Sequence, residues 1–249
     1  MTFSTTPQRT ILFLGATGGV GLSALRRALD AGHACTALCR TPSKLTTIFP
    51  AEEYPDLTVI EGNAHDENAT RAALKSPLDS TRMVDCVLTS IGMGWKGMGF
   101  DDPTVCEDGM TALLGAAASL RREGVAGEPY IVAVSSTGIS KFGRDIPMAY
   151  VPLYHTLGRT PHKDKAVMED LLIASGERFT VVRPSLFVDS STPVETPIRV
   201  GLEDPKTGVV FREIGYTISR EDVGRWIFGE LLSNGGENKY VGKIPSITY

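Results

Sequence analysis

The sequence predicts an α/β fold in which a doubly wound parallel sheet is covered by helices on both faces. Three observations predict it. Short, nearly continuous apolar runs alternate with helical patterns along most of the chain, as is typical of parallel strands buried on both faces. The first apolar run ends in closely spaced glycines, and a helical pattern follows directly. The length of 249 residues suits one substantial core, so we expect a single domain over residues 1–249.

Strands and helices are expected to alternate in order up to about residue 184. Strands are expected at 10–14, 33–40, 57–62, 84–91, 130–136 and 179–183. Helices are expected at 22–29, 66–74 and 163–174, with another from about residue 102. Asp66 is expected to cap the second of these helices, because its carboxylate can accept hydrogen bonds from the free N–H groups of the first turn.

Beyond Pro184 the pattern loosens and prolines interrupt the chain. A hairpin is expected near 208–214. A helix is expected from Ser219 to about Leu232, because Ser219 and Asp222 have the spacing of a capping box. We interpret residues 185–249 as a small substrate lid over the carboxyl edge of the sheet, where α/β folds bind their ligands.

Composition and local sequence patterns argue against several classes of function. A net charge of −4 argues against nucleic acid as the main partner, because phosphate backbones favour basic surfaces. No apolar run approaches the roughly 20 residues of a membrane span, and the first nine residues lack the apolar core of a secretory signal. The four cysteines have neither metal-ligand nor disulfide-framework spacing. We expect a cytoplasmic monomer or homodimer that binds a small-molecule substrate and no metal.

The glycine-rich turn after the first expected strand has the composition of a dinucleotide-binding loop. Glycine permits a tight turn and a close approach of the backbone to phosphates. The start of the next helix offers free N–H groups and a positive dipole end. Strand, turn and helix occur in the order that the motif requires. The residues expected to hold the pyrophosphate are Gly15, Ala16, Thr17, Gly18, Gly19, Val20 and Gly21.

The end of the second expected strand distinguishes NAD from NADP. An NAD-binding protein commonly carries a carboxylate about 20 residues beyond the glycines, where it binds ribose hydroxyls. This chain has Arg40 there, with Lys44 four residues further on. Arginine forms charge-assisted hydrogen bonds with phosphate, so the sequence predicts NADP(H) as the cofactor. An ordinary surface arginine is the alternative.

Further cofactor contacts are expected where later strands end. Asn63 can hydrogen-bond a base edge beyond the third strand, and we interpret the neighbouring His65 as a solvated loop residue. The end of the fourth strand is expected to lie beneath the nicotinamide ribose. The residues expected to contact the cofactor in these places are Asn63, Ala64, Ser90, Gly92 and Pro184.

Several motifs occur together in an order that resembles one family. They are the glycines of 15–21, Arg40, Gly62-Asn63, the serines of 134–136, the segment 180–184 and the segment 219–223. This order resembles the atypical short-chain dehydrogenases/reductases, in particular NmrA-like proteins and the flavin/biliverdin reductase type. Residues 135–189 resemble small NAD(P)-binding proteins common in fungi. The resemblance covers nearly the whole chain and implies a Rossmann-type fold with NAD(P), without specifying the substrate.

The chain departs from that family at the proton donor. Short-chain dehydrogenases usually carry Tyr-x-x-x-Lys, in which the tyrosine donates a proton and the lysine binds the nicotinamide ribose. The resemblance assigns the lysine position to Lys165, but Pro161 stands four residues earlier and has no acidic proton. Lys165 is expected to bind the ribose and support catalysis. A solvated lysine on a helix is the alternative.

Other side chains could replace the missing tyrosine. The candidates are Ser135, Tyr150, Tyr154 and His162. A histidine that titrates near neutrality can act as an acid or a base, although His162 could instead stabilise the start of its helix. Residues 93–100 interleave glycines with Met, Trp and Phe. We interpret them as an apolar flap for a flat substrate, with an ordinary apolar loop as the alternative.

Three functions are compatible with these residues. The first is an NADPH-dependent reductase of a small apolar, aromatic carbonyl, enone, quinone or flavin. Flavin and quinone reduction require little from the protein beyond stacking and orientation, so they tolerate the missing tyrosine. The second is a redox-neutral isomerase, epimerase or cyclase of secondary metabolism. The third is a non-catalytic NADP(H) sensor, as the resemblance to NmrA-like regulators implies.

Overall fold

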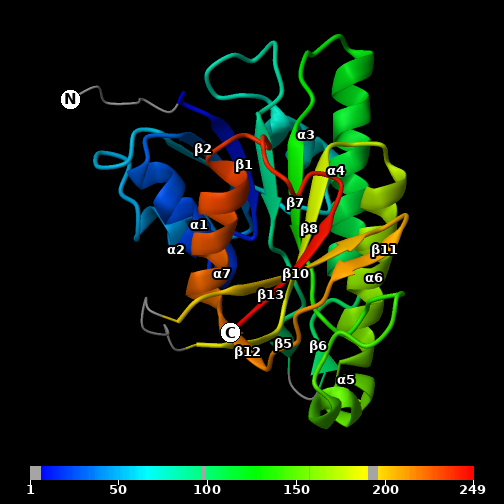
Figure 1. Ribbon diagram of the computed structural model, residues 1–249. Helices are drawn as coiled ribbons and strands as arrows, with labels where there is room; N and C mark the ends of the chain where they lie inside the picture. Colours follow the sequence, from blue (N-terminus) through cyan, green and yellow to red (C-terminus); the bar gives the residue numbers. More distant parts are fainter. Residues whose placement is uncertain (1–6, 97–98, 157, 190–195) are drawn as a thin grey trace, which may run out of the picture.

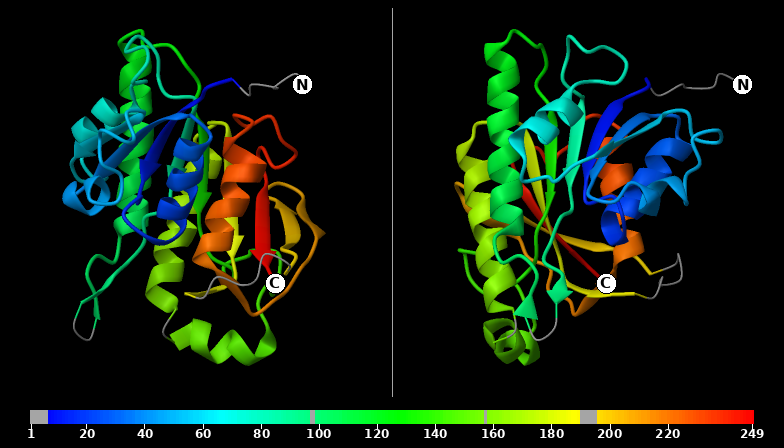
Figure 2. Two further views of the ribbon diagram at one scale, coloured as in Figure 1. Left: turned by 90° about the vertical axis from the view of Figure 1, so that its left-hand side faces the viewer. Right: turned by 180° about the vertical axis from the view of Figure 1, so that it is seen from behind.

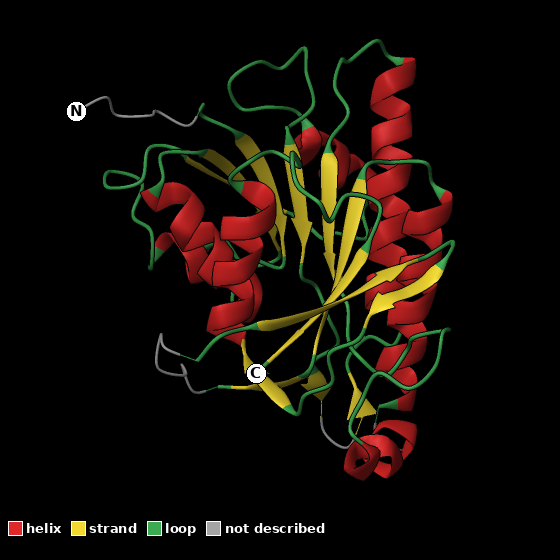
Figure 3. Ribbon diagram, in the orientation of Figure 1, coloured by secondary structure: helices red, strands yellow, loops and turns green. Residues whose placement is uncertain are grey.

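A nine-stranded sheet runs through the centre of the molecule, with helices on both faces (Figures 1 and 3). The computed structural model describes residues 7–96, 99–156, 158–189 and 196–249. The strand order is β11-β10-β13-β8-β7-β4-β1-β2-β3. The predicted α/β class and the doubly wound parallel arrangement are confirmed.

The parallel strands form most of the sheet. They are β1 (Thr10–Leu14), β2 (Ala34–Cys39), β3 (Leu57–Glu61), β4 (Cys86–Thr89), β7 (Tyr130–Val134), β8 (Phe179–Pro184) and β13 (Ile244–Thr248). Every residue of β1, β2, β4, β7 and β8 is buried, which explains their nearly continuous apolar character. The chain returns from β3 at one edge to β4, which pairs with β1. The strand order therefore reverses between β1 and β4, and open α/β sheets bind ligands at such a reversal.

Helices cover each face of the sheet over its own buried cluster (Figure 2). One face carries α1 (Gly19–Asp30), α2 (Ser43–Thr46) and α7 (Arg220–Ile227), which a π-helical turn η2 (Phe228–Leu232) continues. The other carries α3 (Glu67–Leu74), α4 (Val105–Arg122) and α6 (Arg159–Ala174). A short η1 (Met148–Tyr150) and α5 (Val151–Thr156) precede α6. None of the described helices is long and apolar enough to cross a membrane.

Side-chain caps mark the starts of α3 and α7. Asp66 accepts a hydrogen bond from the Asn68 N–H at 2.8 Å, and Ser219 accepts one from the Asp222 N–H at 3.0 Å. Both predicted caps are confirmed. Helix α6 begins at Arg159, four residues before its expected start. Its buried Asp164 accepts hydrogen bonds from the backbone N–H groups of Cys106 and Glu107, at 3.0 and 2.9 Å.

Asp164 thus caps a helix other than its own. The first N–H groups of α4 have no acceptor within that helix, and a carboxylate at this end also favours the helix dipole. The contact joins α6 to the start of α4. Sequence spacing does not reveal it, because the partners are 58 residues apart.

The segment 185–249, interpreted as a lid, supplies part of the body of the protein. Its strands β10 (Arg199–Asp204) and β11 (Gly208–Phe211) form the hairpin expected near 208–214, and β10 pairs antiparallel with β13. Pairing of β10 with β13 satisfies the backbone N–H and C=O groups along the edge of β13. A separate lid would leave these groups to solvent. The short strands β9 (Leu186–Val188) and β12 (Thr217–Ser219) pair parallel to each other. A covering role for this segment stays a prediction.

The expected flap of residues 93–100 contains a short antiparallel pair, β5 (Trp95–Lys96) and β6 (Gly99–Phe100). Residues 97–98 and the side chains of 95–100, including that of Trp95, lie outside the described part of the structure.

A buried ion-pair network joins α6, β8 and β10. The Arg183 guanidinium donates to both carboxylate oxygens of Glu169, at 3.0 and 2.6 Å, and to Glu203 at 2.5 Å. The three side chains are no more than 11% exposed. Burial alone would lower the pKa of Arg183, but the two carboxylates raise it above its ordinary value. The network therefore keeps a full positive charge inside the protein.

Replacing Arg183 with Met should lower the free energy of unfolding by about 3–5 kcal/mol, because two buried carboxylates would lose their partner. Urea unfolding followed by circular dichroism measures the change. Lys141→Met is the control, since Lys141 pairs with Asp170 in solvent and should change stability by at most about 1 kcal/mol. Equal effects of the two variants would contradict a stabilising role of the network.

Candidate functional site

A cleft in two parts lies where the strand order reverses, at the carboxyl ends of the central strands. Its first hollow has a volume of about 610 Å³ and its second about 590 Å³; both volumes are typical of small-ligand sites. Gly18, Ser90, Ile91 and Gly92 line both hollows. The two hollows therefore meet beside the β1–α1 turn and form one elongated site.

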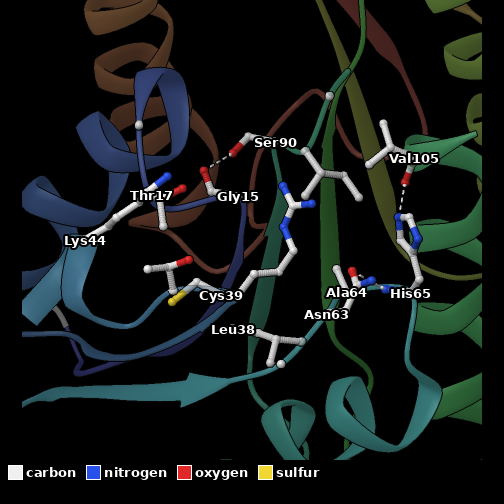
Figure 4. Close-up of a pocket in the computed structure, with 16 residues that line it drawn as sticks. Gly15, Thr17, Leu38, Cys39, Lys44, Asn63, Ala64, His65, Ser90 and Val105 are labelled. Carbon is white, nitrogen blue, oxygen red and sulfur yellow. Dashed lines mark hydrogen bonds between the residues drawn. The ribbon is translucent and has the colours of Figure 1, made fainter. Parts of the chain in front are cut away.

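The first hollow lies among the ends of β1, β2, β3 and β4. Figure 4 shows Thr17 and Lys44 on one side of it and Asn63 and Ala64 on the other. The residues that line it are Gly15, Thr17, Gly18, Leu38, Cys39, Arg40, Thr41, Lys44, Gly62, Asn63, Ala64, His65, Ser90, Ile91, Gly92 and Val105. This set includes six of the residues expected from the sequence to surround the adenosine half and pyrophosphate of a dinucleotide, namely Gly15, Thr17, Gly18, Arg40, Asn63 and Ala64.

Close packing requires glycine at two positions of the turn. Gly15 has a φ of +90°, and a Cβ there would lie 2.8 Å from the carbonyl carbon of Ser90. A Cβ on Gly21 would lie 2.4 Å from the Gly15 oxygen and 2.5 Å from Ser90 Oγ. The Ser90 hydroxyl lies 3.3 Å from the carbonyl oxygens of both Leu14 and Gly15. The turn is held tightly against the end of β4, and the buried Ala16 lies within it.

Gly18 differs from these glycines because it faces the cleft. Its backbone is extended, with a φ of −179°, so its conformation does not require glycine. A Cβ on Gly18 would meet no atom within 4 Å. The residue caps the N-terminus of α1, where the first N–H groups lack helical acceptors and the dipole attracts anions. Open space beside free donors fits a phosphate group.

The first hollow carries positive charge. Arg40 and Lys44 line it, and its described lining contains no Asp or Glu. Arg40 is exposed, and it forms no ion pair with the residues that the structure describes. One arginine and one lysine, with no carboxylate in the described lining to pair with them, fit a phosphate group beyond the pyrophosphate.

His65 lies in a loop, as expected, but its side chain is partly buried and has two contacts. The interpretation of His65 as a solvated residue was therefore wrong. Its Nε2 lies 3.2 Å from the carbonyl oxygen of Val105, and its Nδ1 lies 3.6 Å from the carboxylate of Asp102. The imidazole is 21% exposed and lines the first hollow. The contact partners follow His65 by about forty residues, so no local pattern indicates them.

The second hollow contains the predicted lysine. Lys165 projects from α6, and its Nζ donates a 2.8 Å hydrogen bond to the carbonyl oxygen of Val134 at the end of β7. Pro161, one turn earlier, also lines this hollow. The position of the family's tyrosine therefore lies within the cleft, and the side chain there has no hydroxyl. Pro184 lines the same hollow, as do Gly19 and Val20.

Two serines and a histidine gather beside Lys165. Ser135 is 1% exposed, and its hydroxyl has no hydrogen-bond partner in the described residues. Ser136 donates to the Thr137 carbonyl at 2.9 Å and lies 3.4 Å from His162 Nε2. All three line the second hollow. Because buried hydroxyls usually have partners, Ser135 is a potential contact for a bound molecule.

The two tyrosine candidates are placed differently. The ring of Tyr150 packs edge-on against that of Tyr216, with centroids 5.2 Å apart, and Tyr150 is not part of the described lining of either hollow. The side chain of Tyr154 lies outside the described part of the structure. Of the expected flap, Met93 lines the second hollow.

Two further residues that line the second hollow, Phe187 and Arg220, were not expected from sequence patterns. Phe187 belongs to β9, and Arg220 is the first residue of α7. The guanidinium carbon of Arg220 lies 4.9 Å from the centre of the Phe187 ring. The Ser219 cap predicts that a helix begins here, but where that helix starts in space depends on its packing against α1.

Comparison with known proteins agrees with this geometry. Residues 15–234 match the family model for NAD(P)H-binding proteins. The chain belongs to the NAD(P)H-binding family. With its reductase relative and its fold, this makes it an NAD(P)H-dependent oxidoreductase. The predicted resemblance to atypical short-chain dehydrogenases/reductases is confirmed.

Two fungal relatives of this oxidoreductase carry redox names. It is 38% identical over 264 residues to a protein of Aspergillus terreus named reductase pytE, covering 96% of this chain and 98% of the relative. It is 31% identical over 282 residues to a protein of Aspergillus niger named oxidase pynE, with the same coverage.

Solved structures of distant relatives share the fold. A short-chain dehydrogenase/reductase from Veillonella parvula in complex with NADP has a TM-score of 0.68 and 19% identity, covering 97% of this chain and 94% of that one. The anaerobillin reductase ChuY from Escherichia coli O157:H7 has a TM-score of 0.65 and 18% identity, covering 96% of each chain.

The two kinds of glycine in the turn should respond differently to alanine. In Gly18→Ala the new methyl group enters open space, so the oxidoreductase should fold normally while NAD(P)H binds about tenfold more weakly. In Gly21→Ala the methyl group meets backbone, so the free energy of unfolding should fall by about 1–3 kcal/mol. Thermal unfolding measures the stability of each variant, and titration with NADH and NADPH measures its affinity for the nucleotides. A destabilised Gly18→Ala with unchanged affinity for both nucleotides would contradict the assignment of Gly18 to the cleft.

Proposed function

We propose that this oxidoreductase uses NADPH to reduce a small, apolar and aromatic carbonyl, enone, quinone or flavin. The observation that carries the proposal is the two-part cleft around Gly18. Its first hollow is cationic, with Arg40 and Lys44, and its second hollow holds Lys165, His162 and hydroxyl groups. An elongated site with these two hollows matches the two halves of a dinucleotide.

Each half of the cleft has a role in this proposal. The first hollow takes the adenosine half, with Asn63 and Ala64 beside the base. The pyrophosphate crosses Gly18 at the N-terminus of α1, and the second hollow takes the nicotinamide half. Ser90 and Gly92, which line both hollows, border the passage between them.

The charge of the first hollow supports NADP over NAD. A 2′-phosphate gains charge-assisted hydrogen bonds from Arg40 and Lys44, and no carboxylate in the described lining repels it. The ribose hydroxyls of NAD lack an acidic partner there. The distant structural relative from Veillonella parvula was solved with NADP, which is in line with this preference.

Lys165 holds the ribose of the nicotinamide half in this proposal. An ammonium group has three N–H donors, and the Val134 carbonyl uses one of them. That hydrogen bond sets the direction of the side chain, so the remaining donors can reach hydroxyl groups in the second hollow. Lys165 therefore orients the ring without a neighbouring tyrosine.

Proton transfer requires a group other than Pro161. When bound, NADPH supplies a hydride, and reduction of a carbonyl also requires a proton at its oxygen. An imidazole can act as a general acid, and Ser136 lies 3.4 Å from His162 Nε2. The Ser135 hydroxyl can hydrogen-bond the same substrate oxygen. Quinones and flavins depend less on this arrangement, because their own electronic structure accepts the hydride.

The lining of the second hollow supports a flat, apolar substrate. Met93, Leu186, Phe187 and Pro161 contribute apolar surface, and methionine and aromatic side chains adapt to flat ligands. The two fungal relatives are named as a reductase and an oxidase. Both names favour redox chemistry over the redox-neutral and sensor alternatives.

The direct test is consumption of NADPH by the purified protein against a panel of quinones, flavins, enones and aromatic ketones, with NADH in parallel. We expect oxidation of NADPH with one class of acceptor. Tight binding of NADPH without oxidation by any class would overturn the reductase proposal.

Arg40→Ala should weaken NADPH binding about ten- to a hundredfold and leave NADH nearly unchanged. The expected loss corresponds to about 1.5–3 kcal/mol for hydrogen bonds to a charged group. Isothermal titration with both nucleotides measures the two dissociation constants. Arg122→Ala is the control, because this exposed arginine at the end of α4 does not line the cleft. Equal weakening of both nucleotides would refute the 2′-phosphate assignment.

The relative importance of Lys165 and His162 should depend on the acceptor. With quinones or flavins, Lys165→Ala should reduce turnover more than His162→Ala, since orientation matters more than proton donation. With a carbonyl substrate, His162→Ala should lower kcat by about a hundredfold or more, as loss of an acid does. Steady-state kinetics with each acceptor gives the comparison. An effect of His162→Ala that is the same for quinones and carbonyls would exclude it as the proton donor.

A further inference from the structure

We propose that Arg220 binds the pyrophosphate of the dinucleotide, exchanging its partner Asp189 for the two phosphates. The inference rests on the proposed function, because it requires a dinucleotide in the cleft. It adds a cationic side chain from the C-terminal part of the chain to the phosphate site formed by the β1–α1 turn and the start of α1.

Two close contacts place the start of α7 beside the start of α1. The Ser23 hydroxyl donates a 2.8 Å hydrogen bond to the carbonyl oxygen of Glu221. A Cβ on Gly224 would lie 2.5 Å from Ser23 Cβ, so glycine permits the two helices to touch. Arg220, as the first residue of α7, therefore lies next to the N-terminus that faces the cleft.

The side chain of Arg220 then crosses the phosphate-binding turn. Its Cδ lies 3.0 Å from the position that a Cβ on Gly19 would occupy. It lines the second hollow together with Gly18, Gly19 and Phe187. Beyond the turn, the guanidinium lies over the Phe187 ring. Gly19 and the Phe187 ring therefore hold the side chain of Arg220 at the hollow that Gly18 also lines.

The present partner of Arg220 is weakly held. Arg220 pairs with Asp189, and their side chains are 40% and 93% exposed. An exposed ion pair contributes little, because solvent screens it. A pyrophosphate carries two negative charges and offers the planar guanidinium a bidentate contact. One helix N-terminus supplies only about half a unit of positive charge, so a second source of charge is needed to balance the phosphates.

The proposal predicts an effect that separates Arg220 from Arg40. The pyrophosphate is common to NADPH and NADH, whereas only NADPH has a 2′-phosphate. Loss of Arg220 should therefore weaken both nucleotides by the same factor and leave their ratio unchanged. Loss of Arg40 should change the ratio.

The experiment is a calorimetric titration of each protein with NADPH and with NADH. The proteins are wild type, Arg220→Met, Arg220→Lys, Arg40→Ala and Asp189→Asn. Methionine keeps an unbranched stem to pack on Phe187 and Gly19. We expect Arg220→Met to raise both dissociation constants about tenfold. Arg220→Lys should fall between Arg220→Met and wild type, because it keeps the charge without the bidentate geometry. Asp189→Asn should tighten both nucleotides about twofold, since it removes the competing carboxylate.

Arg122→Met serves as the control for loss of one positive charge, and thermal unfolding confirms that each variant is folded. The proposal would be overturned if Arg220→Met and Arg220→Lys bound both nucleotides with dissociation constants within twofold of those of wild type. A change confined to the KM of the acceptor would also overturn it, because it would assign Arg220 to the substrate. If wild type binds neither nucleotide, the proposed function fails as a whole. If Arg40→Ala behaves as expected and Arg220→Met does not, only the Arg220 proposal fails.

Discussion

The contact between the β1–α1 turn and the end of β4 determines the position of the whole cleft. Gly15 and Gly21 permit this contact, because a Cβ at either position would overlap backbone or the Ser90 side chain. The turn places the N-terminus of α1 at the reversal of strand order, where dipole and free N–H groups face the open space over Gly18. Both hollows share Gly18 and Ser90, so the two halves of the site depend on one packed junction.

Buried polar groups hold the other wall of the cleft in place. Asp164 of α6 caps α4, and Glu169, one turn beyond Lys165, pairs with Arg183 of β8. Both contacts are directional and shielded from solvent, so displacement of α6 would leave charged groups without partners. The helix that carries His162 and Lys165 is therefore held against the sheet from two sides. The buried contacts fix the position of the helix, and the hydrogen bond to the Val134 carbonyl then directs the Lys165 side chain.

Proline at position 161 changes what the site can do. The residue lines the second hollow, so the position at which the family carries its tyrosine lies within the cleft. What remains nearby is the buried Ser135 hydroxyl and the pair of Ser136 and His162. In the proposed function, such a site orients a flat acceptor and supplies a proton less directly than a tyrosine beside a lysine would. The proposal therefore favours acceptors that carry their own electron-accepting system.

Features that depend on neighbours along the chain could be predicted from the amino-acid sequence alone. Buried strands, the caps at Asp66 and Ser219, and the glycine turn follow from local patterns, and so does the absence of tyrosine before Lys165. Tertiary structure alone decided the surroundings of His65, the position of Arg220 beside Gly19, and the addition of β10 and β11 to the sheet. Their partners lie tens to hundreds of residues away in the chain. Such contacts form where two surfaces pack together. The spacing of residues within one segment does not predict which other segment it will pack against.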